Sequence, residues 1–218
     1  MEQLNFEETL QEGVKSKRTS YDITKRVVDF FCSFLGLIIL SPILLIVALI
    51  IKLDSKGPII FKQERVGFRG KKFYMYKFRS MVVNAEELKE KLQEQNEMNG
   101  PMFKMKEDPR ITKVGKFIRK TSIDELPQLI NVLKGEMSLV GPRPSLPKEV
   151  MNFESWMLKR LEVKPGLTCY WQVSGRSSIG FEEWMKLDCK YVDERSTLVD
   201  LKLIFKTFFV LFGDEDAC

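Results

Sequence analysis

The chain of 218 residues contains no histidine. This absence removes the usual general base of enzymes, the Ser-His and Cys-His nucleophile pairs, and the commonest protein ligand of zinc. Any acid–base or nucleophilic chemistry must therefore use carboxylates, lysine, tyrosine or cysteine. Carboxylates are plentiful, because 30 residues are Asp or Glu.

Cysteine is also scarce. The four thiols belong to Cys32, Cys169, Cys189 and Cys218, and no two of them form the C-x-x-C pair of a zinc or redox site. Cysteines so widely separated favour buried, inert thiols in a reducing compartment. We therefore expect no zinc or redox-active centre.

The composition is that of a folded protein with a basic bias. At 44% hydrophobic residues the chain can bury the core of one domain, or of one domain plus a membrane element. The net charge is +5, and basic residues gather near the N-terminal hydrophobic run. Anionic lipid headgroups or phosphorylated substrates are therefore the expected partners.

One long hydrophobic run dominates the N-terminal part. Residues 1–20 are polar, and the run after them has no small-residue cleavage site, so we expect no removable signal peptide. Phe30 to Ile51 carries no charge and, at about 1.5 Å per residue, is long enough to cross a bilayer core of about 30 Å. The sequence thus predicts a membrane helix at 21–53 and a cytoplasmic domain at 54–218.

Both flanks of this run are basic. The flanking cations are Lys15, Lys17, Arg18, Lys25 and Arg26 before it, and Lys52, Lys56, Lys62, Arg65 and Arg69 after it. By the positive-inside rule both flanks belong in the cytoplasm, which a helix that bends at Ser41 and Pro42 and returns would satisfy. A kinked single-span anchor, with the main domain outside the cytoplasm as one variant, stays open as the alternative.

A β-hairpin is predicted next to the membrane. The segments Pro58–Val66 and Lys72–Arg79 are rich in β-branched and aromatic residues, and a glycine-containing turn separates them. Lys77 and Arg79 fall on one face of the second strand. That face is either a solvated basic surface or a phosphate contact.

Three helical segments are expected in the rest of the chain. Residues 84–97 alternate charged and polar side chains, which indicates an exposed helix or a mobile connection. The spacing from Ile111 to Ile118 predicts a short amphipathic helix that leads into Arg119, a phosphate ligand or a surface residue. Residues 200–212 are too short to span a bilayer and suit an interfacial or a core helix. The fold class is α+β and mainly helical.

The central segment runs from Arg119 to Gly135. Its apolar residues at i, i+3, i+4 and i+7 predict a helix, and Pro127 places the start of that helix near Asp124. Asp124 and Glu125 would then lie at the positive end of the helix dipole, and Ser122 with Glu125 fits a capping box. From the segment alone, a structural cap and a catalytic carboxylate both remain open.

Stiff turns follow this segment and carry two arginines. Prolines on both sides of Arg143 suit either bidentate oxyanion binding or a rigid turn. Arg176 is a further candidate anion contact. Tyr170 and Trp171 would stack on a base or fill core.

These residues form ordered blocks over most of the chain. The blocks are Lys25-Arg26 with Asp29, Ser41-Pro42, Gly57-Pro58 with Gln63 and Arg65, Tyr76-Lys-Phe-Arg-Ser-Met81, Asp108-Pro-Arg-Ile-Thr112, Asp124-Glu-Leu-Pro-Gln128, Gly135-Glu-Met-Ser-Leu-Val-Gly-Pro-Arg-Pro144, Pro165-Gly-Leu-Thr168 and Trp171-Gln-Val-Ser-Gly-Arg176. From about Lys25 to Phe212 the chain resembles the bacterial sugar transferases, specifically the monotopic phosphoglycosyl transferases. Cys169 departs from the glycine that is common after Pro-Gly-Leu-Thr. Larger relatives carry additional N-terminal membrane helices, so we expect a short form or a truncation.

The resemblance implies a membrane fold, a reaction and roles for site residues. The helix would break at Ser41-Pro42 and re-enter the cytoplasmic leaflet of the bacterial inner membrane. Asp124 would attack the β-phosphate of a UDP-sugar, release UMP and carry the phosphosugar until polyprenyl (undecaprenyl) phosphate displaces it. Glu125, with Asp124 beside it, matches the Mg²⁺ site. The positions that match phosphate or nucleotide contacts are Lys77, Arg119, Arg143 and Arg176.

The resemblance also implies partners. These are a UDP-sugar with galactose or glucose, polyprenyl phosphate, membrane lipids and the downstream glycosyltransferases of exopolysaccharide or glycan assembly, with no nucleic acid. Pairing into a homodimer stays open. The alternative function is a non-catalytic membrane-surface scaffold, in which Asp124 and Glu125 only cap a helix.

Overall fold

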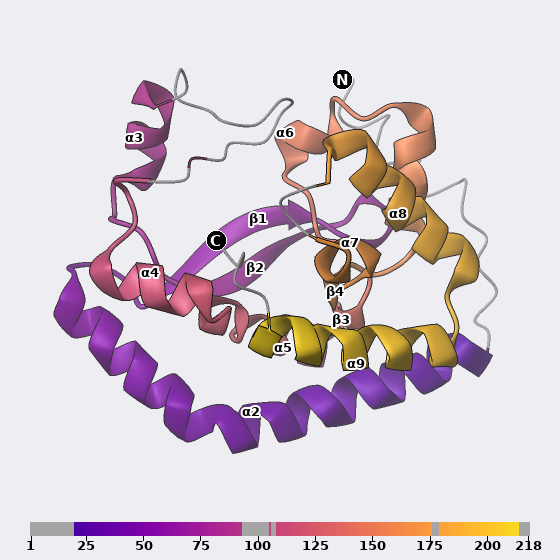
Figure 1. The fold of residues 1–218 in the computed structure, drawn as a ribbon, viewed down its shortest axis with the longest axis horizontal. Helices are drawn as coiled ribbons and strands as arrows, with labels where there is room; N and C mark the ends of the chain where they lie inside the picture. Colours follow the sequence, from indigo (N-terminus) through magenta and orange to yellow (C-terminus); the bar gives the residue numbers. More distant parts are fainter. Residues whose placement is uncertain (1–19, 93–104, 106–107, 176–178, 214–218) are drawn as a thin grey trace.

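A computed structural model describes residues 20–92, 105, 108–175 and 179–213 (Figure 1). The predicted polar segment 1–20 therefore lies outside the described residues except for Ser20. The elements in chain order are α2 (Ser20–Asp54), β1 (Ile60–Val66), η1 (Phe68–Gly70), β2 (Lys72–Phe78), α3 (Ala85–Lys91), α4 (Lys113–Lys120), η3 (Ile123–Glu125), α5 (Gln128–Lys134), β3 (Ser138–Val140), α6 (Pro147–Val150), η4 (Ser155–Glu162), β4 (Gly166–Thr168), α7 (Tyr170–Val173), α8 (Phe181–Glu194) and α9 (Thr197–Gly213).

Helix α2 underlies the whole domain. Within the described part of the chain, it alone is long and apolar enough to cross a membrane, and most of its apolar window faces outward. The helix is continuous through Pro42, where a break was expected, and its axis bends in the middle (Figure 1). Pro42 cannot donate a backbone hydrogen bond, and Ser41 Oγ donates to the Ile38 carbonyl at 2.7 Å. The chain therefore bends at this place without leaving the helix.

The first arm of α2 is bound to the domain through its basic residues. Arg26 donates from Nη1 to the Val132 carbonyl and from Nη2 to the Leu133 carbonyl, both at 2.8 Å, and so caps the C-terminal end of α5. Lys25 forms a 2.7 Å ion pair with Asp200 of α9. Lys25 and Arg26, which were counted in the basic flank of the hydrophobic run, therefore bind α9 and α5.

Asp29, one turn further along α2, is buried as well. Its Oδ1 accepts from Ser138 Oγ at 3.0 Å and from the Leu139 N–H at 2.9 Å. A buried carboxylate is tolerated where it is hydrogen-bonded, so this contact locks α2 onto β3.

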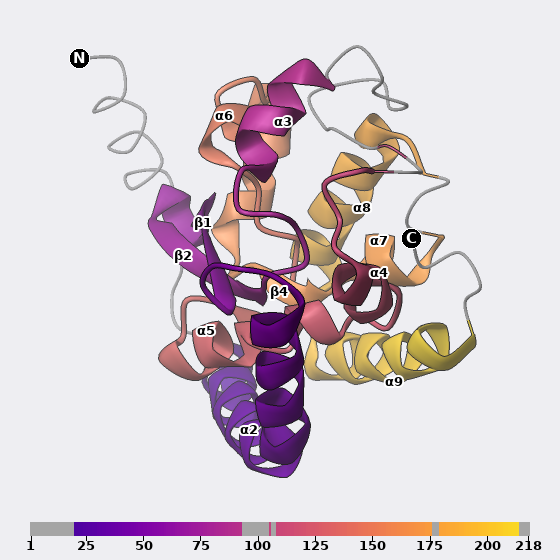
Figure 2. The same cartoon turned by 90° about the vertical axis from the view of Figure 1, so that its left-hand side faces the viewer.

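The second arm of α2 packs on the same domain. Val47 and Ile51 are buried against Phe78 of β2 and Ile118 of α4. Arg79 Nη2 donates to the Ser55 carbonyl at 2.6 Å, just beyond the end of the helix. Both ends of α2 therefore contact one and the same folded unit, as Figure 2 shows from the side.

The predicted hairpin is confirmed. β1 and β2 pair antiparallel, with Ile60 opposite Phe78 and Val66 opposite Lys72. A second, parallel pair joins β3 to β4, with Ser138 opposite Gly166. These strands of three residues each were not predicted.

Asn131 connects the hairpin to the central helix. Its Oδ1 accepts from the Tyr76 N–H at 3.0 Å, and its Nδ2 donates to the Tyr74 carbonyl at 2.8 Å and to Glu136 Oε2 at 2.7 Å. The side chain is fully buried. A buried amide with both ends satisfied fixes β2 in register against α5.

Replacing Asn131 by alanine should therefore destabilise the fold. The change leaves buried groups on Tyr74 and Tyr76 without partners, which costs about 2 to 3 kcal/mol. For a chain of this size that lowers Tm by roughly 4 to 12 °C, measurable by a thermal melt in detergent. The control is Asn152→Ala, because Asn152 Nδ2 donates only to the exposed Lys148 carbonyl. Equal shifts for both variants would refute the role of Asn131.

Helix α9 lies alongside α2 on one side of the molecule (Figures 1 and 2). It is three residues longer at its N-terminal end than expected, and it exposes Leu198, Leu201, Ile204, Phe205, Phe208 and Phe209. Together with the outward face of α2 it forms a continuous apolar side. Such large exposed apolar patches mark contact with a partner or a membrane.

The cysteine prediction is only partly right. Cys169 is fully buried in the core with Val140, Tyr191 and Leu203. The core therefore accommodates a cysteine side chain at the position where the family pattern commonly has glycine. Cys32 is exposed on α2 and Cys189 is partly exposed, while Cys218 lies outside the described residues. Burial was inferred from the wide separation of the cysteines, which does not show that Cys32 lies on the outward face of α2.

Candidate active site

The two central acids lie in a turn that precedes the helix. Ser122 has a positive φ of 54°, and the short 3-10 helix η3 carries Asp124 and Glu125, whereas α5 begins only at Gln128. The predicted capping box is wrong, because an N-cap needs an extended backbone and the Glu125 N–H is taken by the Ser122 carbonyl at 3.2 Å. The Ser122 side chain caps none of the described residues.

Two cations from separate elements meet Glu125. Lys77 of β2 lies with Nζ 2.7 Å from Glu125 Oε1, and Arg143, from the loop after β3, lies with Nη1 3.2 Å from the same oxygen. The structure therefore brings Lys77, Glu125 and Arg143 together, whereas each of them was assigned a separate role from the sequence. Both cations remain partly exposed, at 16% and 31% of their side chains, so a ligand can reach them.

The two acids have opposite protonation behaviour. Burial raises the pKa of Asp124 to about 6, Lys77 opposes that shift, and the charge of Glu125 adds to it. Burial also disfavours the charged form of Glu125, but Lys77 and Arg143 outweigh it and hold the pKa of Glu125 well below its usual range. Asp124 is thus mostly ionised at neutral pH in spite of its burial, and its position in a 3-10 turn gives it no full helix dipole.

The remaining predicted cations differ in their placement. Arg119, in the last turn of α4, is exposed, lines the same cavity as Asp124 and lowers the pKa of Asp124 by its charge. Arg79 follows the end of β2, and its Nη2 donates to the Ser55 carbonyl just beyond α2. Arg79 is buried and is therefore not part of a solvated basic surface, and it lines the same cavity, so its phosphate contact stays a prediction. Arg176 lies outside the described residues.

A large cavity connects the acids to the apolar side of the molecule. It has a volume of about 1260 Å³, and its lining includes both acids, the three cations and the apolar groups of two helices: Lys77, Arg119, Asp124, Glu125, Arg143, Gly36 and Leu40 of α2, and Ile204, Phe205 and Phe208 of α9. Trp171 also lines it and stacks on Trp184, with ring centroids 4.5 Å apart. Tyr170 is partly buried against the core instead.

Asp124 and Glu125 fit a magnesium site in which protein side chains supply only some of the ligands. Within the described ranges no group of three or more potential metal ligands occurs, so a cage made only of side chains is absent from them. Mg²⁺ beside phosphates is usually held by one or two carboxylates, waters and the phosphates themselves. Two adjacent carboxylates that line a cavity together with three cations are compatible with that mode.

From the sequence, no role at the site was assigned to three residues near it, which are Arg65, Arg160 and Asp188. Arg65 Nη1 donates to the Pro144 carbonyl at 2.9 Å, and Arg160, paired with Asp188, donates to the Arg143 carbonyl at 2.5 Å. Charged residues in polar segments give no sign of burial. The one feature of the sequence that pointed to this region was the pair of prolines that stiffens the loop around Arg143.

The chain is similar in sequence to known proteins. A family model described as bacterial sugar transferase matches residues 20–214. The galactosyl transferase CpsE of Streptococcus agalactiae serotype III (strain NEM316) is 49% identical over 200 residues, which cover 91% of this chain and 44% of that protein. The undecaprenyl-phosphate galactose phosphotransferase of Salmonella typhimurium (strain LT2) is 45% identical over 211 residues, covering 93% and 43%.

A shorter relative matches over most of its own length. The exopolysaccharide production protein ExoY of Sinorhizobium fredii (strain NBRC 101917 / NGR234) is 40% identical over 192 residues, which cover 85% of this chain and 84% of that protein. The chain thus spans less than half of the first two relatives and most of the third. Because the family match covers nearly all of the described fold, the chain belongs to the bacterial sugar transferase family.

Proposed function

We propose that the chain transfers a sugar 1-phosphate from a UDP-sugar to polyprenyl phosphate through a covalent intermediate on Asp124. The observation that carries this proposal is the cavity that joins Asp124, Glu125 and their cations to the apolar faces of α2 and α9. One substrate is soluble and charged, and the other is a lipid with a phosphate head. The printed names of relatives support this choice, since one acts on undecaprenyl phosphate and galactose.

In the first step Asp124 is the nucleophile. A carboxylate oxygen of Asp124 bonds to the β-phosphorus of the UDP-sugar, and the bond from that phosphorus to the bridging oxygen breaks. UMP leaves with the bridging oxygen, and the sugar phosphate stays on Asp124. Lys77, Arg119 and Arg143 bind the diphosphate and offset the charge that grows on the departing phosphate.

In the second step the lipid acceptor takes the phosphosugar. A phosphate oxygen of polyprenyl phosphate bonds to the same phosphorus, the Asp124 oxygen–phosphorus bond breaks, and the lipid-linked diphosphate sugar forms. Glu125, with Asp124, would hold Mg²⁺, which when bound supplies positive charge to the diphosphate oxygens. Lys77 and Arg143 keep Glu125 ionised for that purpose.

We further propose that α2 enters the cytoplasmic leaflet of the bacterial inner membrane and returns, so that the protein is monotopic. A straight helix of 35 residues would be about 50 Å long, enough to place its ends on opposite faces of a bilayer. Both arms instead contact one folded unit, and α9 adds exposed apolar side chains beside them. This arrangement supports a site held at the height of the lipid phosphate.

The topology can be tested by cysteine labelling. In a chain without its native cysteines, Asp22→Cys and Asp54→Cys mark the two ends of α2. The re-entrant helix predicts that an impermeant maleimide labels both positions only after the cytoplasmic face becomes accessible. Labelling of the two positions from opposite faces would exclude it.

The function is tested by UMP release. Purified protein with Mg²⁺ and a panel of UDP-sugars, beginning with UDP-galactose and UDP-glucose, should release about one UMP per chain without acceptor, as covalent catalysis requires. Added undecaprenyl phosphate should permit repeated turnover. A scaffold with no enzymatic activity would release no UMP from any member of the panel.

A further inference from the structure

A buried ion pair lies behind the candidate active site. Arg160 of η4 and Asp188 of α8 approach to 2.7 Å, with side chains only 1% and 0% exposed. Such a pair is costly to desolvate, and apolar residues of similar volume often serve packing equally well. Packing alone therefore does not explain this ion pair. A guanidinium can form hydrogen bonds that a hydrophobic side chain cannot.

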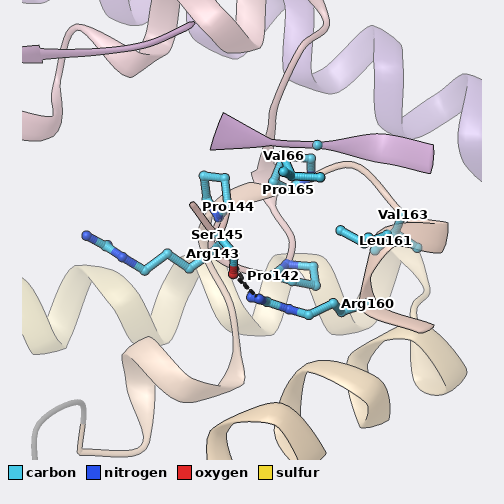
Figure 3. A pocket seen from close by; sticks show the side chains of 10 residues that line it. Val66, Pro142, Arg143, Pro144, Ser145, Arg160, Leu161, Val163 and Pro165 are labelled. Atoms are coloured by element: carbon cyan, nitrogen blue, oxygen red, sulfur yellow. Dashed lines mark hydrogen bonds between the residues drawn. The ribbon is translucent and has the colours of Figure 1, made fainter. Parts of the chain in front are cut away.

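Arg160 also binds the loop that carries Arg143. Its Nη2 donates to the Arg143 carbonyl at 2.5 Å, and its Nη1 donates to Ser145 Oγ. Figure 3 shows Arg160 reaching this loop from one side while the Arg143 side chain extends away from it. The Arg160 guanidinium thus binds the backbone of Arg143, while the Arg143 side chain lines the cavity and pairs with Glu125.

A second arginine, the partly buried Arg65, binds the other side of the loop. Arg65 Nη1 donates to the Pro144 carbonyl at 2.9 Å, and the Val66 N–H donates to the Ser145 carbonyl at 2.9 Å. The loop between Pro142 and Ser145 is therefore fixed to β1 as well as to η4. Arg143 projects from it to Glu125.

We propose that Arg160, oriented by Asp188, is a positioning residue that fixes the backbone of Arg143 so that its guanidinium meets the donor diphosphate. The inference rests on the proposed function and adds to it a residue pair remote from the reacting atoms. Catalytic groups must be held within a fraction of an ångström, which a backbone contact from a rigid guanidinium provides. Asp188 acts only through Arg160.

The test uses two matched pairs of substitutions. Arg160→Met with Asp188→Leu removes both buried charges together, so that neither is left unpaired. Lys159→Met with Asp193→Leu makes the same changes in the neighbouring pair, which joins the same two elements but is 40% and 59% exposed. Arg160→Lys keeps a charge opposite Asp188 but cannot serve both loop acceptors at once. Folding of each variant is checked by its thermal melt.

The readout is the rate of covalent labelling by UDP-galactose or UDP-glucose carrying a ¹⁴C-sugar, with its dependence on donor concentration. Loss of the buried pair, or Arg160→Lys, should slow labelling about ten- to a hundredfold and raise the half-saturating donor concentration, as loss of outer supporting contacts does. The exposed pair should change neither quantity. In an Arg143→Ala background, replacing the buried pair should cause no further loss.

Other outcomes would overturn the inference. These are normal labelling by either Arg160 variant, or losses that multiply with that of Arg143→Ala. If the double replacement does not fold, the comparison of Arg160→Lys in the two backgrounds decides alone. Failure of the unaltered chain to label would instead contradict the proposed function.

Discussion

Asp124→Asn should abolish covalent labelling by a UDP-sugar, with a loss of at least about 10⁴-fold, because amides are poor nucleophiles and removal of a nucleophile has effects of this size. Labelling is measured with a ¹⁴C-sugar donor, Mg²⁺ and no lipid acceptor. The fold should not suffer, since burial already disfavours the charged form of Asp124 and the amide is its neutral isostere. Tm should therefore stay unchanged or rise.

The matched control is Asp193→Asn. Asp193 lies on α8, is 59% exposed and pairs with the solvent-exposed Lys159. It should label like the unaltered chain. If Asp124→Asn labelled normally and merely lost about 1 kcal/mol of stability, the acids would be structural and the nucleophile would be wrong.

Glu125→Gln should produce the second-largest effect. Loss of the charge proposed to bind Mg²⁺ should slow labelling roughly 10²- to 10³-fold, which corresponds to the several kcal/mol that a metal contributes to such reactions. The Mg²⁺ concentration for half-maximal rate should rise. The half-saturating UDP-sugar concentration should not rise, because Lys77 and Arg143 lose their internal counter-charge and become freer to bind the diphosphate.

Metal removal provides the companion measurement. EDTA should stop labelling by the unaltered chain, and Mg²⁺ should restore it. Glu182→Gln, which changes an exposed carboxylate on α8, should leave the response to Mg²⁺ unchanged. An identical Mg²⁺ dependence for Glu125→Gln and the unaltered chain would exclude Glu125 as a metal ligand.

The elements that the sequence predicted well are those set by local pattern. The hairpin follows from two β-rich runs around a turn, α4 from apolar spacing, and the end of α5 from Gly135, which has the expected positive φ of 83°. The family resemblance gave roles to Lys77, Glu125 and Arg143, but their meeting was not predicted. No local pattern links these positions, which lie far apart in the chain.

The errors have tertiary causes. The start of α5 was expected near Asp124, but Asp124 lies in the separate 3-10 turn η3 and α5 begins only at Gln128. The contacts of Lys25 and Arg26 with α9 and α5 were not predicted, because sequence rules count charges without their partners. Asn131 and Arg160 are likewise polar residues whose importance follows from burial.

These contacts give α2 a structural role beyond that of an anchor. Arg26 caps the helix that follows the two acids, and Asp29 holds the strand before the Arg143 loop. The apolar helix and the candidate active site are therefore parts of one packed unit. A chain lacking α2 should lose the site along with the membrane contact.

The most direct test of the account is the identification of the modified residue. After incubation with a UDP-sugar and Mg²⁺ in the absence of acceptor, the protein is digested at low pH and its peptides are analysed by mass spectrometry. The account predicts a hexosyl phosphate on Asp124, removed when undecaprenyl phosphate is added. Released UMP with an unmodified Asp124, or a phosphosugar on any other residue, would contradict it.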